Sequence, residues 1–414
     1  MGSDPSLVPA RRNQLGMRVN QGGARYWPVF ALFPILVVGQ AKATGWSSIA
    51  GLDATVLSVA LLMGITTVTF LSHPRYPVRA MLPFFIFALV VLLGVAHSDL
   101  GEYQYLKTRD FFLLTGVVVA CIPVLLRDIR DLRGLLFVWL FGGVVVASLV
   151  LVIGGAEDLY GRAGIGDSTL GPAYLSAAAL VVGSAAMGER LVVPALAVPA
   201  MVVSGVALVA IGSRGPIIGA ALGLLTWVLM RGAFRIRSVL VVLVVMAVVV
   251  VGVREASEAA LDRLILEDPS RRMLWAEAWE ASLDSPFLGM GWGDFATLSW
   301  VHVYPHNLLL ETSVELGVLG LFALLGLLAA VFIRVWRTRT TPEVRVLAGV
   351  VVVLLIGQQF SSDLTNRMFW TAVIPCLLLP VFATGIGTQP GNARSGAPGP
   401  GRAAAHRHPN QASR

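Results

Sequence analysis

Long apolar stretches recur from one end of the chain to the other, separated by short breaks that carry charged residues, glycine or proline. A helix needs about 20 mostly apolar residues to cross the hydrocarbon core of a bilayer, and the stretches have about this length. The pattern therefore predicts roughly twelve membrane-spanning helices. The predicted spans are 27–43, 52–72, 78–96, 110–126, 134–153, 171–187, 191–211, 215–231, 237–253, 306–333, 345–362 and 367–386.

The composition supports this interpretation. Hydrophobic residues make up 56% of the 414 positions, and charged residues only 13%. A soluble globular chain is less apolar, and about a quarter of its residues are charged. The composition thus excludes a soluble globular protein. We expect an all-α, polytopic bundle of membrane helices with one long, partly helical outer loop.

The apolar pattern also divides the chain into segments. Residues 1–26 form a basic arm without a clear small-residue cleavage site, so the first span is expected to remain uncleaved. Helices one to nine fall within 27–253, and helices ten to twelve within 306–386. The long loop occupies 254–305. Residues 387–414 are rich in glycine, proline and alanine and are expected to be a disordered tail.

Arginines gather in alternate connections between the predicted spans. By the positive-inside rule that side is cytoplasmic, and an even number of spans places both termini there. The formal charge of +7 then reflects membrane topology, and no groove of basic and aromatic residues indicates a nucleic-acid partner. The arginines on this side are Arg75, Arg79, Arg127, Arg130, Arg133, Arg190, Arg231, Arg235, Arg237, Arg334, Arg337, Arg339 and Arg345.

The loop 254–305 is much longer than the other connections, which marks it as a place for function. Residues 254–266 have helical spacing, and Asp268-Pro269 is a plausible start for a second helix, SRRMLWAEAWEASL. The following SPFLGMGWGDF is too rich in glycine for a regular element and predicts a turn-rich return to the membrane. Because no strand precedes these glycines, a dinucleotide-binding loop is excluded.

Ionisable residues are predicted to meet at the outer membrane surface. Arg214 lies in a very short connection between two apolar helices, Arg271 and Arg272 begin the second loop helix, and His306 begins the next span. An arginine this close to hydrocarbon is costly unless it is paired or hydrated, which makes Arg214 a functional candidate. The alternative is an arginine that reaches the lipid headgroups and binds a phosphate there.

The span after the loop begins with several polar residues. Asn307, Glu311 and Glu315 stand at i, i+4 and i+8 and form one helical stripe, which predicts the wall of a cavity open to the outside. Alternatively, the glutamates are structural partners of nearby arginines. With an ordinary pKa near 6.5, neutral His306 is available as a base, although a helix-start histidine is also unremarkable.

The two cysteines, Cys121 and Cys376, lie inside predicted helices and outside any disulfide or metal-binding pattern, so we expect them to serve packing. No DxD-type pair of carboxylates stands on the outer face to predict a metal site. The sequence thus gives no metal ligands and no cofactor.

Three segments together resemble a known family. They are SRG at 213–215, the arginine-tryptophan helix 271–275 with PFLGMGWGDF at 286–295, and PHNLLLETSVELGVLGL at 305–321. In their order and placement they are similar to the motifs of the O-antigen ligase and O-antigen polymerase superfamily of bacterial membrane proteins. The resemblance covers about 205–325.

The resemblance implies a metal-independent, GT-C-like glycosyltransferase in the bacterial cytoplasmic membrane. Such enzymes take a glycan from an undecaprenyl-diphosphate carrier and pass it to an acceptor hydroxyl on the outer face. The acceptor is a glycolipid core sugar in ligases and another carrier-linked repeat unit in polymerases, and the sequence does not distinguish the two.

The same resemblance implies roles for individual residues. Arg214 and Arg271 would bind the diphosphate, and Arg272 is the alternative to Arg271, because the family arginine commonly stands four residues before the tryptophan, here Trp275. His306 would accept or orient the acceptor hydroxyl. Two further residues, Asn307 and Glu311, would hold the histidine helix in register.

A secondary transporter is the alternative from another class, since twelve helices with both ends inside also describe many transporters. Against it, the sequence shows no repeated pair of interrupted helices, and the polar candidates gather at the outer surface. Convergence of Arg214, Arg271 and His306 in space would favour glycan transfer over transport.

Overall fold

A computed structural model describes residues 27–40, 48–49, 52–99, 101–153, 170–232, 269–298, 303–360 and 363–385. Within these ranges the chain is almost entirely helical, apart from turns and one small antiparallel ladder of two-residue strands, β1 (Ser48–Ile49) and β2 (Leu52–Asp53). The predicted basic arm, the first loop helix, the span 237–253 and the C-terminal tail lie outside the described residues. Their assignments remain predictions.

The helices follow the predicted spans closely. They are η1 (Trp27–Ala31), α1 (Leu32–Val38), α2 (Ala54–Ser72), α3 (Val78–His97), α4 (Glu102–Arg109), η3 (Asp110–Thr115), α5 (Gly116–Leu125), α6 (Ile129–Ile153), α7 (Leu170–Gly188), α8 (Pro194–Ile211), α9 (Arg214–Met230), α12 (Pro269–Asp284), η4 (Asp294–Thr297), α13 (Leu308–Arg337), α14 (Pro342–Phe360) and α15 (Arg367–Gly385).

Eight helices of the described part are long and apolar enough to cross a membrane. Three shorter apolar helices, Pro28–Val38, Arg214–Met230 and Arg367–Phe382, accompany them. The chain is therefore a multi-pass membrane protein, while the total of about twelve spans stays a prediction. The eight are Ala54–Ser72, Val78–His97, Glu102–Leu125, Ile129–Val152, Leu170–Gly188, Pro194–Ile211, Leu308–Arg337 and Pro342–Phe360.

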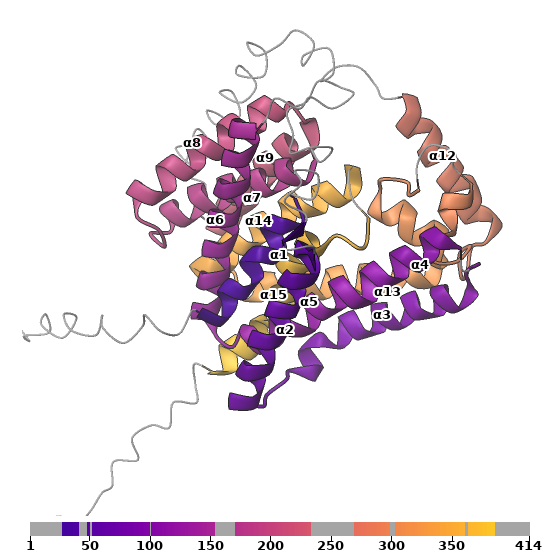
Figure 1. Cartoon of the computed structure of the whole chain (residues 1–414), viewed down its shortest axis with the longest axis horizontal. Coiled ribbons are helices and arrows are strands. Elements are labelled where there is room, and N and C mark those ends of the chain that lie inside the picture. Colours follow the sequence, from indigo (N-terminus) through magenta and orange to yellow (C-terminus); the bar gives the residue numbers. More distant parts are fainter. Residues whose placement is uncertain are drawn as a thin grey trace, which may run out of the picture.

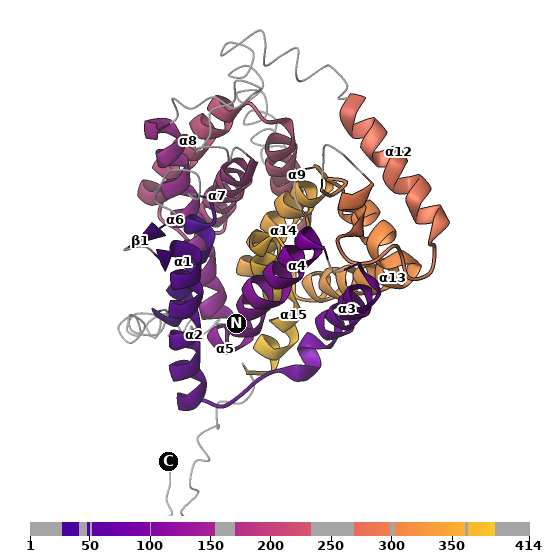
Figure 2. The same ribbon diagram turned by 45° about the vertical axis from the view of Figure 1, so that its right-hand side comes forward.

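Figure 1 shows α6, α7, α8 and α9 on one side of the bundle and α3, α12 and α13 on the other, with α5, α14 and α15 between them. Turning the molecule brings forward α12, which lies along the outside beside α13 (Figure 2). Helix α14 packs against both α9 and α7, and α13 packs against α3. The central helices thus connect the arginine helix α9 with the histidine helix α13.

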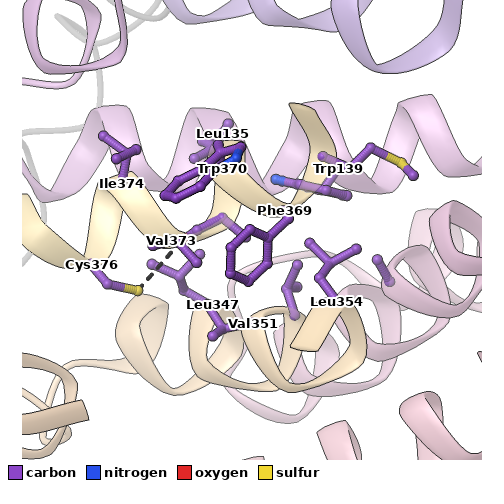
Figure 3. Packing of buried hydrophobic residues seen from close by; sticks show 14 of the residues in the cluster. Leu135, Trp139, Leu347, Val351, Leu354, Phe369, Trp370, Val373, Ile374 and Cys376 are labelled. Carbon is purple, nitrogen blue, oxygen red and sulfur yellow. Dashed lines mark hydrogen bonds between the residues drawn. The ribbon is translucent and has the colours of Figure 1, made fainter. Parts of the chain in front are cut away.

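The centre of the bundle is filled by large apolar side chains (Figure 3). Phe369 and Trp370 of α15 are fully buried between α6 and α14, where Trp139 and Leu347 pack around them. Cys376 lies in the same layer and its thiol points to the Ala372 carbonyl of its own helix. Both cysteines are free and buried, which confirms that they serve packing.

Helices α9 and α14 approach each other at glycines. A Cβ added to Gly223 would lie 2.7 Å from the Gly349 carbonyl oxygen, and one added to Gly219 would lie 3.2 Å from the Val353 carbonyl. Small residues allow membrane helices to pack backbone against backbone. This contact fixes the position of α9, whose first residue is Arg214.

Ion pairs tie the helices together at the end of the bundle where α7 and α9 finish and α14 begins. The Glu189 carboxylate accepts bonds from Arg345 at 2.6 Å and 3.0 Å and from the Trp227 indole at 2.9 Å. Arg133 pairs with Glu343 at the same end. Burial alone raises the pKa of Glu189, but the bonds from Arg345 and Trp227 outweigh it and place the pKa below its usual value.

Candidate functional site

His306 stands immediately before α13, at the opposite end of the bundle from these ion pairs. Its backbone has a φ of 54°, in the left-handed region that residues other than glycine seldom adopt. Asn307 is the N-cap of α13, and its side-chain oxygen accepts the backbone N–H groups of Leu309 and Leu310, each at 3.1 Å. The Tyr304 ring lies 4.3 Å from the half-buried imidazole. The histidine is thus held in a defined place by its neighbours in sequence.

Helix α12 is attached directly to this turn. The Trp275 indole Nε1 donates a 3.0 Å hydrogen bond to the Pro305 carbonyl. Arg271 stands one helical turn before Trp275 and is half-buried, whereas Arg272 is exposed. The difference in exposure supports Arg271 over Arg272 as the member of the pair that faces the site.

A small apolar cluster fixes α12 against the first turns of α13. Leu274, Ala278 and Ala281 on the inner face of α12 pack with Val314 and Phe295. Near the C-terminal end of α12, the Ser282 hydroxyl lies 3.1 Å from the Ser313 hydroxyl of α13. The predicted second loop helix is confirmed, and this packing determines which of its residues face the bundle.

Arg214 is the first residue of α9. Gly212 ends α8 in the left-handed conformation with a φ of 63°. A Cβ on Gly215 would lie 2.2 Å from the Tyr174 hydroxyl and 3.8 Å from Cβ of Phe360. Glycine at this position lets the start of α9 approach the Tyr174 hydroxyl of α7, while Phe360 at the end of α14 lies at an ordinary van der Waals distance.

Phe360 connects the separate motifs. One side of the residue faces the start of α9 beside Arg214, and its ring centroid lies 6.5 Å from that of Trp275. Trp275 in turn binds the residue before His306. Phe360 and Trp275 thus link the start of α9, helix α12 and the turn that holds His306, although these segments lie far apart in the sequence.

The two glutamates after His306 do not line an open cavity, and that prediction was wrong. Nζ of Lys107, on α4, lies 2.7 Å from a Glu311 carboxylate oxygen and 2.6 Å and 2.7 Å from those of Glu315. The three side chains are at most 1% exposed. The alternative of structural ion pairs is correct for these glutamates, but the partner is a lysine and not an arginine.

Further contacts close this buried charge cluster, formed by Lys107, Glu311 and Glu315. The ammonium lies 4.6 Å from the centre of the Trp292 ring. Glu315 also accepts a bond from the Gly293 backbone, and Glu311 lies 3.4 Å from the Leu364 backbone nitrogen. Buried charges of this kind require partners because transfer from water is costly. The cluster thereby attaches the histidine helix to α4 and to the loop before α15.

Sequence reasoning missed Lys107 for a physical reason. The predicted span began near residue 110, because charged residues precede that point, whereas the helical segment starts at Glu102. The helix continues through the wider turns of η3 into α5. The available signal was Lys107 itself, three residues before the predicted span, since a lysine at membrane depth requires an acidic partner within the protein.

Helix α13 is interrupted at Gly317, where φ is 63° and ψ is −162°. The freed carbonyls of Val314 and Glu315 accept the backbone N–H groups of Met290 and Gly291 at 2.8 Å and 3.2 Å. On the other side of the break, Val318 donates to the Pro286 carbonyl at 2.8 Å. The glycine-rich segment of the loop thus replaces the missing helical bonds, as backbone at membrane depth requires.

Tyr304 also faces a cavity of about 240 Å³ at the same end of the bundle. Burial raises the pKa of its phenol, and the negative charges of Asp363 and Glu311 raise it further. The phenol therefore remains a neutral hydrogen-bond donor beside His306. Within the described ranges, no three His, Cys, Asp or Glu side chains gather in a group that could hold a metal ion.

The segment that carries these motifs matches a known family. Residues 199–325 match the family model described as O-antigen ligase. The match begins in α8, includes Arg214, Arg271, Trp275 and His306, and ends in α13 beyond the break. No curated protein matches the chain.

Proposed function

We propose that the chain transfers a glycan from an undecaprenyl-diphosphate carrier to an acceptor hydroxyl, because residues 199–325 match the O-antigen ligase family model. The observation that carries the proposal is the series of contacts that links the three motif segments. Phe360 lies beside the start of α9 and near the Trp275 ring, and Trp275 bonds to the turn that holds His306. Membrane packing alone does not require arginines and a histidine at such a junction.

In this proposal, Arg214 and Arg271 bind the diphosphate of the donor. The carrier diphosphate gains negative charge as its bond to the sugar breaks, and a guanidinium binds phosphate oxygens through paired N–H groups. Arg214 also stands at the start of α9, where Ser213 makes no side-chain capping bond. The positive end of the helix dipole at this first turn favours an anion. Trp275 supports Arg271 from the next turn of α12.

His306 takes the proton of the attacking hydroxyl. The acceptor oxygen forms a bond with the anomeric carbon, the bond from that carbon to the diphosphate breaks, and the proton moves to the imidazole. The left-handed backbone of His306, the Asn307 cap and the buried charge cluster at Glu311 hold the imidazole in place. The arginines supply the positive charge that a divalent metal supplies in other diphosphate-using enzymes.

The expected location is the bacterial cytoplasmic membrane, with both termini in the cytoplasm and His306 at the outer face. The arginine-rich ion pairs of Glu189 and Glu343 lie at the opposite end of the bundle, as the positive-inside rule requires of the cytoplasmic side. The acceptor is a glycolipid core for a ligase and a carrier-linked repeat unit for a polymerase. Both activities use the same site residues.

A secondary transporter remains the second candidate, because interrupted helices such as α13 also occur at transporter binding sites. The break at Gly317 differs from such sites, since residues 286–291 fill it and bond its freed backbone groups. A transported ion would need these groups for coordination. The geometry at the break thus favours glycan transfer.

The test is glycan profiling of cell-envelope extracts from a deletion strain. The strain is complemented with the wild type, Arg214→Ala, Arg271→Ala, His306→Ala or the surface control Arg130→Gln, and membrane levels are compared by blot. We expect the wild type and the control to restore a glycan, and the three site variants to accumulate carrier-linked precursor. Full restoration by all three site variants would reject the proposed site. Loss of transfer on EDTA treatment of isolated membranes would reject the role given to the arginines.

A further inference from the structure

A polar cavity lies beside the histidine turn, and apart from Tyr304 its described lining residues lie outside the segment that matches the family. Its volume is about 240 Å³, slightly below the range of roughly 300–1,000 Å³ typical of small-molecule sites. The walls come from the end of α1, the start of α7, Tyr304 and the turn before α15. Such a volume suits one sugar residue and not a longer glycan. Its polar lining residues are Gln40, Tyr304, Asp363, Thr365, Asn366 and Arg367.

The turn that forms one wall is held from several directions. Asp363 accepts bonds from the Thr365 hydroxyl at 2.7 Å and from the Thr365 backbone at 3.1 Å. The Thr365 carbonyl accepts the Thr115 hydroxyl at 2.6 Å, and the Leu364 carbonyl accepts the Trp370 indole at 2.8 Å. Polar groups held in this way lose little freedom when a ligand binds.

Arg367 provides a positive charge in the cavity, and the carboxylates of Asp110 and Asp53 act on it without forming an ion pair. Its guanidinium makes no ion pair within the described ranges, and Nη1 is buried without a hydrogen-bond partner there. A buried donor without a partner carries a desolvation cost that a ligand oxygen can remove. Asp363, in the same lining, offers a carboxylate to hydroxyl groups.

The cavity also contains the carboxamide of Gln40, which its neighbours hold in one position. The Gln40 amide bonds to the Met368 sulfur at 3.5 Å, and its oxygen lies over Gly171, where an added Cβ would be only 1.7 Å away. Carboxylate, carboxamide, guanidinium and phenol groups together present both donors and acceptors. This mixture is the pattern that binds the hydroxyls of a sugar.

The position of the cavity decides which sugar it would hold. Tyr304 lines it, and the Tyr304 ring contacts the imidazole of His306. No residue of α9 or α12, the helices with Arg214 and Arg271, is among the described lining residues. The cavity thus adjoins the base and not the arginines that would hold the donor diphosphate.

We propose that this cavity binds one sugar residue of the acceptor glycan and presents its hydroxyl to His306, with Asp363, Arg367 and Gln40 as the specificity-determining contacts. The inference rests on the proposed function and deepens it. An acidic sugar is favoured over a neutral one, because its carboxylate would pair with the Arg367 guanidinium.

The first experiment measures binding without turnover. Detergent-solubilised wild type is tested by saturation-transfer NMR with glucuronate and with glucose at millimolar concentration. We expect a stronger signal with glucuronate, its loss in Arg367→Gln and its retention in the exposed control Arg130→Gln. Absence of a glucuronate signal in the wild type, or an equal signal in Arg367→Gln, would overturn the proposal.

A second variant distinguishes loss of binding from loss of folded protein. Gly39 lines the cavity with an ordinary helical φ of −58°, so Gly39→Leu fills space without removing a polar group. An added Cβ at this position would lie 3.5 Å from Nη2 of Arg367, an ordinary contact. We expect Gly39→Leu to abolish the glucuronate signal while the thermal midpoint stays close to that of the wild type.

The second experiment tests whether the cavity binds the acceptor or the donor. Transfer by purified protein is measured with carrier-linked donor and acceptor glycan isolated from the deletion strain. Asp363→Asn and Arg367→Gln are expected to raise the KM for acceptor about tenfold or more and leave the KM for donor unchanged, with Asp284→Asn on exposed α12 as control. A change confined to the donor KM, or no change, would overturn the assignment. Absence of transfer by the wild type would instead reject the proposed function, while the binding result stands by itself.

Discussion

The Trp275 indole of α12 donates a 3.0 Å hydrogen bond to the carbonyl of Pro305, the residue before His306. This bond connects α12, the loop helix that contains Arg271, with the turn that contains His306. The Trp275 ring also packs near Phe360. The bond therefore holds α12 and the histidine turn in a fixed position relative to each other. The relationship explains why a tryptophan accompanies the arginine pair.

Removing this bond should reduce transfer more than stability. Trp275→Phe retains an aromatic ring beside Phe360 but has no indole N–H. A neutral hydrogen bond contributes about 0.5–1.5 kcal/mol, so transfer should fall roughly 2- to 10-fold. Initial rates and thermal midpoints of purified protein measure both effects. Trp279→Phe is the control, because Trp279 is 57% exposed on the same helix. Equal rates for Trp275→Phe and the wild type would show that the bond does not position the site.

The buried charge cluster predicts a large stability effect. Lys107→Met leaves the Glu311 and Glu315 carboxylates without their ammonium partner, which should cost about 3–5 kcal/mol. Unfolding of detergent-solubilised protein measures the loss. The triple variant Lys107→Met, Glu311→Gln and Glu315→Gln should recover most of it, because no buried charge then remains unpaired.

The exposed pair of Arg109 and Asp110 is the matched control. Both side chains are more than a third exposed, and such pairs contribute at most about 1 kcal/mol. Arg109→Gln should therefore unfold almost like the wild type. If Lys107→Met is as mild as Arg109→Gln, the buried charge cluster does not stabilise the histidine helix.

The break in α13 predicts opposite outcomes for two glycines of the same helix. Gly317 has a φ of 63°, and an added Cβ would lie 2.4 Å from the Phe287 carbonyl carbon, so Gly317→Ala should severely reduce folded protein. Gly326 has no atom within 4 Å of an added Cβ. Gly326→Ala should be neutral or slightly stabilising. Size-exclusion profiles of the two variants give the comparison, and similar profiles would show that the break is not required.

The opposite end of the bundle predicts a pH effect on stability. The pKa of Glu189 lies below the ordinary value of 4.5, because bonds from Arg345 and Trp227 outweigh the effect of burial. A carboxyl with a lowered pKa stabilises the folded state above its unfolded pKa, and this stabilisation is lost as the pH falls through the folded pKa. Glu189→Gln should thus lower the thermal midpoint at pH 7, and its difference from the wild type should shrink below about pH 4.5. A difference that stays constant between pH 7 and pH 4 would contradict this.

The apolar pattern predicted most of the helices, because span length and hydropathy are local properties. The predicted 171–187 and the observed Leu170–Gly188 agree almost to the residue. The break at Gly317 was not predictable in the same way, since the sequence around it remains apolar. What produces the break is the backbone of residues 286–291, which supplies bonds from a distant segment.

The candidate site was also only partly predictable from the sequence. Arg214, Arg271 and His306 were predicted from their position at the membrane surface and from the motifs, and Phe360 and Trp275 link the segments that contain them. The partner of Glu311 and Glu315 could not be assigned, because Lys107 is 208 positions away from Glu315. The cavity beside Tyr304 is built from four separate segments, and only the segment of Tyr304 carries a recognisable motif.

The most direct test of the account is single-turnover transfer by purified protein. Carrier-linked glycan and acceptor are isolated from the deletion strain, and release of undecaprenyl diphosphate is followed together with glycosylation of the acceptor. We expect both products with the wild type and a loss of roughly 100-fold or more with Arg214→Ala, Arg271→Ala or His306→Ala, at unchanged thermal midpoints. Wild-type rates from all three folded variants would contradict the proposed site.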